Sequence, residues 1–257
     1  MYSQATNSKP PKSLLRTVGR AIADYGMIQS GDRVLVGVSG GKDSLSLLNI
    51  LLHLRRYAPV KFDLAAITVD PKIEGFDPSP LKHYMAAKGV SYFYQAQAIE
   101  QRAVNHMGNQ SFCSFCSRMK RGIMYATASK EKYNVLALAQ HLDDLAESFL
   151  MSAFHGGQLR TMKACYTNEK GDLRVIRPLI YARERQTAAY SESADLPVIP
   201  DNCPACFDVP TQRQHMKELL AKEELHNPNL FKNMLSTLHP LLNQSYYVRN
   251  TDTDASK

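Results

Sequence analysis

The residues of this sequence that are best suited to chemistry begin with a short glycine-containing loop. The loop is "SGGKDS" (39–44), which follows the apolar run "VLVGV" and precedes a second apolar stretch. Adjacent glycines let the backbone turn tightly and bring its N–H groups close to an anion. The helix expected after the loop adds partial positive charge, and Lys42 can neutralise phosphate oxygens. The loop therefore predicts a phosphate-binding site.

This loop differs from the commonest phosphate-binding patterns. A Walker A loop has an earlier glycine and a Ser or Thr after its lysine, where this chain has Val36 and Asp43. Read as it stands, the hexapeptide resembles the pyrophosphate loop of the N-type ATP pyrophosphatases, which cleave ATP between its α and β phosphates and leave AMP on an acceptor oxygen. The alternative is a glycine turn that only caps a helix. The resemblance implies that ATP is bound by Ser39, Gly40, Gly41, Lys42, Asp43 and Ser44.

Polar residues also follow two other apolar runs that we expect to be strands. "ITVD" (67–70) ends one run, and in this superfamily that strand end holds adenine and ribose, which assigns Val69 and Asp70 to the nucleotide site. "AQHLDDLAES" (139–148) ends another and brings His141, Asp143 and Asp144 to the start of a helix. Such aspartates can simply cap a helix and complement its dipole. Beside a phosphate loop we expect them to hold Mg²⁺ or to orient a nucleophile.

Two cysteine pairs form a second candidate site. "CSFC" contains Cys113 and Cys116, and "CPAC" contains Cys203 and Cys206, so each pair has the spacing that lets both thiolates reach one metal. The gap between the pairs is far longer than in a zinc ribbon, so the fold must bring them together. On the residues alone, structural zinc, an iron–sulfur cluster and a redox relay all remain open. Cys165 stands alone, and we expect it to be a buried apolar residue.

The elements that must position these residues alternate along the chain. Apolar β-rich runs at 33–39, 62–70, 90–97 and 134–140 are separated by helix patterns near 43–56, 79–88, 117–130 and 142–155. Near-continuous apolar strands between amphipathic helices indicate an α/β fold, a doubly wound, mainly parallel sheet with helices on both faces. Residues 171–179 and 197–200 are expected to add edge strands. Ligands of such folds bind at the carboxyl ends of the strands.

Three regions are expected along the chain. Residues 1–30 form a short N-terminal helical segment, with a helix near 13–27. Residues 31–200 form the ATP-binding catalytic domain with an inserted CxxC segment. Residues 201–257 form a C-terminal appendage with the second CxxC pair, a helix near 212–223 and a disordered tail. No stretch resembles a linker, so both end segments are expected to be appendages on one domain.

The composition is that of an ordinary globular protein. Of 257 residues, 44% are apolar and 21% are charged. The apolar runs are shorter than the roughly 18 residues of a membrane helix, and the N-terminal stretch lacks the features of a secretory signal. We therefore expect a cytoplasmic protein with no membrane partner. The net charge of +7 favours a polyanionic partner such as nucleic acid.

With both motifs in hand, the chain resembles the tRNA 2-thiocytidine synthetase family. The shared segments are "SGGKDS", "CSFCSRMKRGIMY", "HLDD", "FHGGQLRTMKA", "IRPLIYARE" and "IPDNCPAC", in that order. The resemblance implies a PP-loop, adenine nucleotide α-hydrolase-like fold and an ATP-dependent tRNA thiolase. In such an enzyme, ATP and Mg²⁺ adenylate the C2 oxygen of an anticodon-loop cytidine, and sulfur then displaces AMP to give 2-thiocytidine. Lys42, Asp43 and Asp144 would be catalytic, and His141 and Asp143 would bind the cofactor.

The resemblance also implies a metal cofactor and partners. An oxygen-sensitive [4Fe-4S] cluster would be held by three cysteines, which are Cys113, Cys116 and either Cys203 or Cys206. The implied partners are tRNA, ATP and a sulfur donor, expected to be a cysteine desulfurase, and family members commonly form homodimers. One alternative is 2-thiolation of another tRNA base. A second is a zinc-stabilised RNA-binding protein without turnover, which iron content would distinguish. Related ATP-dependent amide or lysidine ligases are disfavoured because they need no sulfur.

Overall fold

The computed structural model describes residues 8–99, 112–200 and 211–243 of the chain. Within these ranges one six-stranded sheet has the order β3-β2-β1-β4-β6-β5. The strands are β1 (Arg33–Gly37), β2 (Asp63–Asp70), β3 (Ser91–Ala96), β4 (Val135–Ala137), β5 (Cys165–Thr167) and β6 (Arg174–Ile176). Neighbouring strands are parallel except β5 and β6, which are antiparallel. The predicted α/β fold with a mainly parallel sheet is therefore confirmed.

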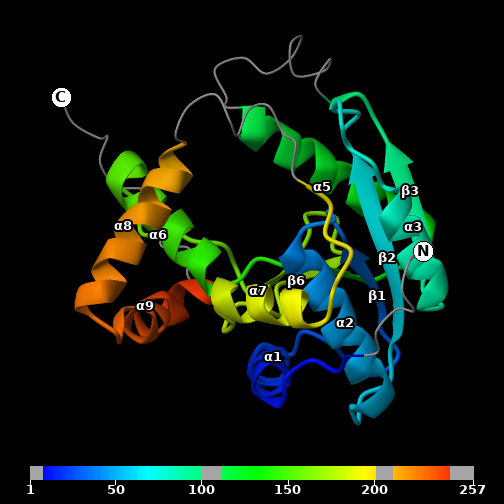
Figure 1. Cartoon of the computed structure of the whole chain (residues 1–257), viewed down its shortest axis with the longest axis horizontal. Coiled ribbons are helices and arrows are strands. Elements are labelled where there is room, and N and C mark those ends of the chain that lie inside the picture. Colours follow the sequence, from blue (N-terminus) through cyan, green and yellow to red (C-terminus); the bar gives the residue numbers. More distant parts are fainter. Residues whose placement is uncertain (1–7, 100–111, 201–210, 244–257) are drawn as a thin grey trace, which may run out of the picture.

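Helices cover both faces of this sheet (Figure 1). They are α1 (Lys12–Asp24), α2 (Lys42–Tyr57), α3 (Ser79–Ala87), α5 (Phe112–Lys130), α6 (Leu142–Gly156), α7 (Glu184–Ser193), α8 (Gln212–His226), α9 (Leu230–Leu238) and the 3-10 helix η2 (His239–Leu242). α5 packs on one face, where Ile123 and Ala128 meet Leu136 of β4. The remaining α-helices contribute to the hydrophobic cluster on the other side. No helix in the described ranges is long and apolar enough to cross a membrane.

Burial on both faces explains why the strands read as continuous apolar runs. Val34 and Val36 of β1 point into the larger cluster, whereas Leu35 between them points into the cluster beneath α5. In β2, Ala66 and Ile67 divide between the same two clusters. Successive side chains of a strand alternate between faces, so a sheet covered on both sides needs apolar residues at every position.

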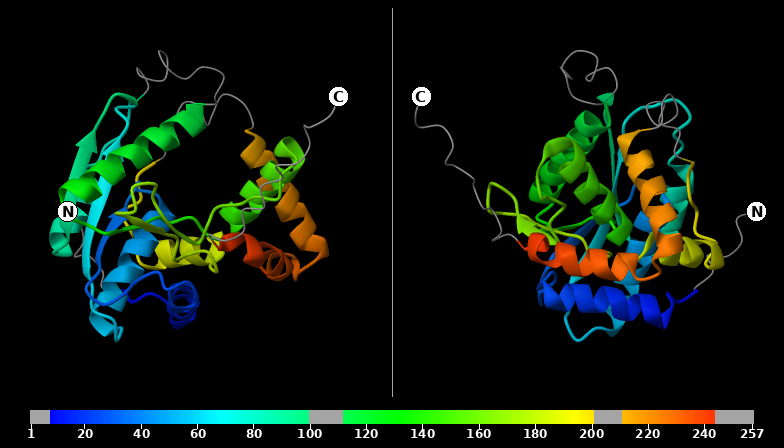
Figure 2. Two further views of the ribbon diagram at one scale, coloured as in Figure 1. Left: turned by 180° about the vertical axis from the view of Figure 1, so that it is seen from behind. Right: turned by 90° about the vertical axis from the view of Figure 1, so that its left-hand side faces the viewer.

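The two end segments pack on the main hydrophobic cluster. Leu14 and Val18 of α1 are fully buried in it, and so are Leu220 of α8 and Phe231 of α9, with at most 6% of their surface exposed. Figure 2 shows α1 and α9 both in the lower half of the molecule, with α1 below α9. The expected domain boundaries stay a prediction. The second cysteine pair and the expected disordered tail lie outside the described residues.

The predicted strands and helices are confirmed except at the less apolar elements. The predicted strand at 197–200 is wrong, because Pro197 and Pro200 lack an N–H for a ladder and Ile199 donates its N–H to the O of Gly40 at 3.0 Å. The segment 171–179 does contain a strand, β6, but β6 lies inside the sheet and β5 forms the edge. Neither β5 nor the helices α7 and α9 were predicted. Cys165, expected to be buried, is only half-buried, on β5.

Candidate active site

A large cleft opens at the carboxyl edge of the sheet. Its volume is about 1650 Å³, and its walls come from the segments after β1, β4 and β6, the end of β2 and one side of α5. Ser39, Val69, Gln140 and Arg177 line it, each from a different strand end. This edge is where open α/β sheets bind ligands.

The loop at 39–44 is organised by its two serines. Ser44 Oγ donates to the O of Gly41 at 2.9 Å and accepts the N–H of Ser39 at 3.2 Å. The N–H of Gly41 donates to Ser39 Oγ at 3.3 Å. Helix α2 begins immediately after Gly41, and this N-cap residue provides no side-chain cap. A bound anion can therefore take the place of the missing cap at the N-terminus of α2.

Gly40 gives the loop its shape. Its φ is +96°, a conformation that side chains other than glycine rarely adopt, and a Cβ at this position would lie 2.4 Å from Cγ1 of Ile199. Ile199 is held against the loop by its backbone hydrogen bond to Gly40, described above. The segment 197–200 is thus a wall of the phosphate loop rather than part of the sheet.

Lys42 lies in a chain of charges that joins three helices. Its Nζ donates to Asp43 Oδ2 at 3.0 Å and to Glu184 Oε1 on α7 at 2.8 Å. The other oxygen of Glu184 lies 2.7 Å from Nζ of Lys217 on α8. Burial alone would raise the pKa of Glu184, but its hydrogen bonds with Lys217 and Lys42 lower that pKa to about 2. Burial lowers the pKa of Lys42, but Glu184 and Asp43 more than offset this and raise it. Both groups are therefore charged at neutral pH.

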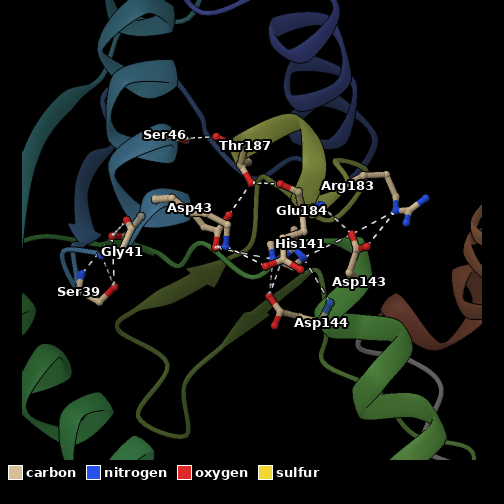
Figure 3. Close-up of polar contacts among 12 residues, drawn as sticks. Ser39, Gly41, Asp43, Ser46, His141, Asp143, Asp144, Arg183, Glu184 and Thr187 are labelled. Carbon is tan, nitrogen blue, oxygen red and sulfur yellow. Dashed lines mark hydrogen bonds and ion pairs between the residues drawn. The ribbon is translucent and has the colours of Figure 1, made fainter. Parts of the chain in front are cut away.

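Asp43 and Asp144 approach the same imidazole (Figure 3). Nε2 of His141 lies 3.8 Å from Asp43 Oδ2 and 3.5 Å from Asp144 Oδ2. The hydroxyl of Thr187 donates to the other oxygen of Asp43. His141 is also the N-cap of α6 and forms a capping box with Asp144. His141 and Asp144 therefore do cap helix α6, as the alternative interpretation of the sequence expected. The same hydrogen bonds hold Asp144 in place, and Asp144 lines the cleft.

Asp143 shares His141 with its neighbour, since its Oδ2 lies 3.6 Å from Nδ1 of His141, but its hydrogen bonds go to other partners. Its Oδ1 accepts from Nε of Arg183 at 3.0 Å, and its Oδ2 accepts the N–H of Glu184 at 2.8 Å. Arg183 in turn donates two hydrogen bonds, of 2.7 and 2.8 Å, to the carboxylate of Glu224 on α8. Asp143 is absent from the described lining of the cleft. The structure thus gives it contacts that join α6, α7 and α8.

Arg213 on α8 reaches back to the acidic residues of α6. Its Nη1 lies 3.3 Å from Asp144 Oδ1, and its Nε lies 3.8 Å from Glu147 Oε2. Glu147 is buried, and burial followed by repulsion from Asp144 raises its pKa to about 7. Arg213 lines the cleft and follows the segment that contains the second cysteine pair.

At the end of β2, the two residues expected to hold the nucleoside face different ways. Val69 lines the cleft, as a residue beside the adenine would. Asp70 is buried and is absent from the described lining. Its carboxylate accepts the hydroxyl of Tyr94 and, at 2.6 Å, the N–H of Lys72. The structure therefore brings Val69, but not the carboxylate of Asp70, to the rest of the predicted site.

Of the predicted cysteine ligands, the structure describes one side chain. Cys116 is buried in the first part of α5, in the cluster between α5 and the sheet. Cys113 lies on the same helix, and its side chain is outside the described residues, as are Cys203 and Cys206 altogether. Ser117, which follows Cys116, lines the cleft.

Sequence reasoning did not identify four residues that the structure places in or beside this site. Glu184 and Thr187 come from α7, which has no apolar stripe. Arg183 and Arg213 are two of many basic residues that could contact tRNA phosphates, and nothing in the sequence sets them apart from solvated charges. The available signal was the segment "IRPLIYARE", which contains Arg183 and Glu184 and is one of the shared family segments. Its contacts with Lys42 and Asp143 could not be read from sequence spacing.

The chain matches known proteins over most of its length. Residues 12–222 match the PP-loop domain family. The chain is 39% identical over 231 residues to the tRNA-cytidine(32) 2-sulfurtransferase of Geobacter sulfurreducens, which covers 88% of this chain and 89% of the relative. It is 37% identical over 241 residues to the tRNA-cytidine(32) 2-sulfurtransferase of Aliivibrio salmonicida, covering 91% of this chain and 76% of the relative.

The fold is also found in a solved structure. The U34-tRNA thiolase NcsA from Methanococcus maripaludis, determined with its [4Fe-4S] cluster, superimposes with a TM-score of 0.75 at 22% identity, covering 90% of this chain and 78% of that chain. At this identity the likeness establishes the PP-loop fold. The sequence matches establish the nearer relationship and confirm the resemblance inferred from the motifs. This chain belongs to the tRNA-cytidine(32) 2-sulfurtransferase family of PP-loop proteins.

Proposed function

We propose that this chain, a tRNA sulfurtransferase of the family just named, uses ATP to adenylate the C2 oxygen of an anticodon-loop cytidine and then replaces that oxygen with sulfur. The observation that carries the proposal is that Ser39, Gly41, Ser44, Asp43 and Asp144 line one cleft. Lys42 and His141 contact Asp43 there, and His141 also contacts Asp144. Sulfur cannot readily displace a cytosine carbonyl oxygen, because this oxygen is a poor leaving group. Once this oxygen is bonded to the α phosphorus, it departs as one of the phosphate oxygens of AMP, which is a good leaving group.

The loop and the start of α2 supply the groups that would hold the triphosphate. The backbone N–H groups after Gly40 and the uncapped N-terminus of α2 can donate hydrogen bonds to the β and γ phosphates of ATP. Lys42 is charged and can neutralise an oxygen of the same phosphates once it leaves Glu184. Val69 is the apolar contact for adenine on the neighbouring strand end. The cytosine oxygen then attacks the α phosphorus, and pyrophosphate leaves as the P–O bond breaks.

Asp43 and Asp144 are suited to bind a divalent cation. Both are partly buried carboxylates, and both Oδ2 atoms lie within 4 Å of Nε2 of His141. The two carboxylates are therefore close enough to provide oxygen ligands to one cation. Mg²⁺ bound there would stabilise the negative charge on the departing pyrophosphate. His141 is held by the backbone of Asp144 and keeps the two carboxylates in position.

We propose a [4Fe-4S] cluster held by Cys113, Cys116 and either Cys203 or Cys206. Three thiolates suit iron, and an iron without a protein ligand would bind and activate the sulfur. The described residues support a location at the cleft: Ser117 lines it next to Cys116, and Pro200 lines it three positions before Cys203. Three residues span at most about 10 Å, so the length of the chain allows Cys203 to reach the same cleft.

tRNA is the substrate that the charge of the cleft favours. Lys120, Arg121, Lys163 and Arg213 line it, and the chain as a whole carries a net charge of +7. Such residues position RNA through its phosphates, and an unpaired loop base can be turned out into a pocket. A cysteine desulfurase as the sulfur donor and a homodimer remain predictions.

A reconstituted reaction tests the proposal. Protein purified without oxygen is incubated with unmodified tRNA, ATP, Mg²⁺ and sulfide, and the tRNA nucleosides are analysed by mass spectrometry. We expect 2-thiocytidine with the wild-type chain and none with Lys42→Ala. A different thionucleoside would show that the mechanism holds but the base is wrong. If wild-type protein with intact iron forms no thionucleoside, the proposal is overturned.

Iron content tests the cluster separately. We expect Cys113→Ser to lose most of the iron and the brown colour, whereas Cys165→Ser, a matched change at a half-buried cysteine on β5, retains both. Zinc in place of iron in the anaerobically purified wild type would contradict the cluster.

A further inference from the structure

One wall of the cleft contains two tyrosines and a buried arginine from three different elements. Tyr125 comes from α5, Tyr166 from β5, and Arg177 directly follows β6; all three line the cleft. The two tyrosine hydroxyls lie 2.9 Å apart. The guanidinium carbon of Arg177 lies 5.6 Å from the centre of the Tyr166 ring. This group has no part in the nucleotide site described above.

Arg177 is a buried cation that is held firmly in place. Only 4% of its surface is exposed. Its Nε donates to Oε1 of Gln140 at 3.0 Å, and its Nη1 donates to the O of Lys163 at 2.6 Å. Both acceptors are neutral oxygens, so the hydrogen bonds fix the guanidinium plane but leave its charge uncompensated.

No carboxylate compensates this charge within the residues that the structure describes. The groups that act on Arg177 there are Tyr166, Tyr125 and a second cation, Arg121. Burial lowers the pKa of the Arg177 guanidinium, which reflects the cost of keeping a cation in this position. Arg174, on the same strand, shows the ordinary arrangement, since its Nη1 lies 2.8 Å from Asp32. A buried cation that faces a ligand cleft without a counter-charge is suited to an electronegative atom of the ligand.

The position of this group separates it from the proposed ATP site. Val69 on β2 and Arg177 after β6 both line the cleft, with β1 and β4 between their strands. Neighbouring strands are about 4.8 Å apart, so the two residues are separated by about 14 Å across the strand ends. That distance leaves room for a nucleotide on the β2 side and for the acceptor on the β6 side, with the 39–44 loop between them.

We propose that Tyr125, Tyr166 and Arg177 form the subsite that receives the target pyrimidine once it is turned out of the RNA. The base stacks against the tyrosine wall, and Arg177 donates to its 2-oxygen, where negative charge is greatest and where AMP is to be attached. Arg121, which is exposed on α5, contacts a phosphate beside the target nucleotide. This inference rests on the proposed function, because it names the place at which that reaction's acceptor is bound.

A nucleobase fits this group better than a phosphate alone. A phosphate needs several donors and no aromatic surface, whereas two of the three residues here are tyrosines that line the cleft. Stacking on an aromatic ring and one directed hydrogen bond are the usual means of holding an unpaired base. The more exposed Arg121 is the residue that suits the backbone.

Two anticodon stem-loop RNAs test the subsite without turnover, one with cytidine at the target position and one with an abasic nucleotide there. Their dissociation constants are measured by fluorescence anisotropy. For the wild type we expect the abasic RNA to bind on the order of tenfold more weakly, as stacking of one base gives. Tyr166→Leu and Arg177→Lys should bring the two constants together by weakening only the cytidine RNA. Tyr166→Phe keeps the ring and should keep most of the preference. Arg121→Ala should weaken both RNAs alike.

Matched controls come from outside the cleft. Tyr133→Phe changes a buried tyrosine of the hydrophobic cluster between α5 and the sheet, and Arg174→Lys changes the ion-paired arginine of β6. Neither change should alter the ratio of the dissociation constants of the abasic and cytidine RNAs. Melting temperatures exclude unfolded variants. Equal affinity of the wild type for both RNAs, or an unaltered ratio in folded Tyr166→Leu and Arg177→Lys, would overturn the subsite. Thiolation by the wild type, assayed in parallel, reports on the proposed function independently of these ratios.

Discussion

Glu184 on α7 holds the ammonium of Lys42, the phosphate-loop lysine, at 2.8 Å. Because the second oxygen of Glu184 binds Lys217, the loop is connected through α7 to α8. A phosphate that binds Lys42 must compete with Glu184 for this ammonium. The Lys42–Glu184 contact is therefore an ion pair that stabilises the fold, and it also positions the lysine side chain before ATP binds.

Replacing Glu184 tests the stabilising part of this contact through its pH dependence. The pKa of Glu184 is lowered to about 2 in the folded protein, from 4.5 for a free glutamate. Its stabilisation is therefore complete above about pH 4.5 and is lost as the pH falls towards 2. We expect Glu184→Gln to lower the free energy of unfolding at pH 7, and the difference from wild type to shrink between pH 4.5 and 3. Urea denaturation at each pH measures it.

The control for this experiment is Glu192→Gln, on the same helix. Glu192 is exposed and forms no ion pair within the described residues. Its difference from wild type should be small at every pH. A Glu184→Gln difference that is equally small at pH 7 would contradict the stabilising role of the Lys42–Glu184–Lys217 chain.

Gly40→Ala should disrupt the phosphate loop. The φ of +96° and the 2.4 Å approach of a Cβ to Ile199 Cγ1 both oppose a side chain here. We expect ATP affinity, measured by calorimetry, to fall at least about tenfold, and the melting temperature to fall as well, since such strain costs about 1–3 kcal/mol. Gly156→Ala, where an added Cβ has no atom within 4 Å, is the matched control. Shortening Ile199 to Ala as well should recover part of the stability, because it relieves the clash but not the backbone strain.

The adjacent aspartates of α6 should behave differently when each becomes asparagine. Asp144 lines the cleft, so Asp144→Asn should lower kcat for thiolation by about 100-fold or more with little change in stability. Asp143 contacts Arg183 and the N–H of Glu184, so Asp143→Asn should lower the free energy of unfolding by about 1–3 kcal/mol and reduce kcat far less. Steady-state kinetics and denaturation on the same samples separate the two effects. Equal losses of kcat would show that both carboxylates take part in the reaction.

The fold and the first half of the site could be predicted because their signals are local. The 39–44 loop is contiguous, and β1, β2 and β4 are buried on both faces, so each reads as an apolar run in the sequence. The same physics explains the failures. β5 has three residues, none of them fully buried, and α7 buries only Thr187, Tyr190 and Ser191, so neither leaves an apolar pattern.

The second half of the site depends on contacts between distant residues. Lys42 and Glu184 are 142 positions apart, and Arg213 and Asp144 are 69 apart. No spacing rule links such pairs, since they meet only when α7 and α8 pack against α2 and α6. The carboxylate of Asp70 shows the converse, because its strand-end position suggested a ligand contact and the neighbouring Tyr94 takes it instead.

The charge of Glu147, which lies near Asp144 and Arg213, can be tested through the pH dependence of stability. Burial and Asp144 raise its pKa in the folded protein to about 7, above the 4.5 of a free glutamate. The folded state therefore holds a proton that the unfolded state releases, and wild-type stability falls as the pH rises from about 4.5 through 7. Glu147→Gln carries no such charge. We expect it to be more stable than wild type at pH 8 by about 1–3 kcal/mol and to show less advantage at pH 5.

Denaturation at pH 5 and pH 8 measures this difference, with Glu223→Gln on α8 as the exposed control. Because Arg213 lies 3.8 Å from Glu147 and favours its charged form, Arg213→Gln should raise the pKa of Glu147 further and enlarge the stability loss between the two pH values. A Glu147→Gln advantage that is the same at pH 5 and pH 8 would show that Glu147 is ionised throughout this range. In that case Arg213 compensates its charge fully, and the cluster carries one more negative charge towards the proposed Mg²⁺ site.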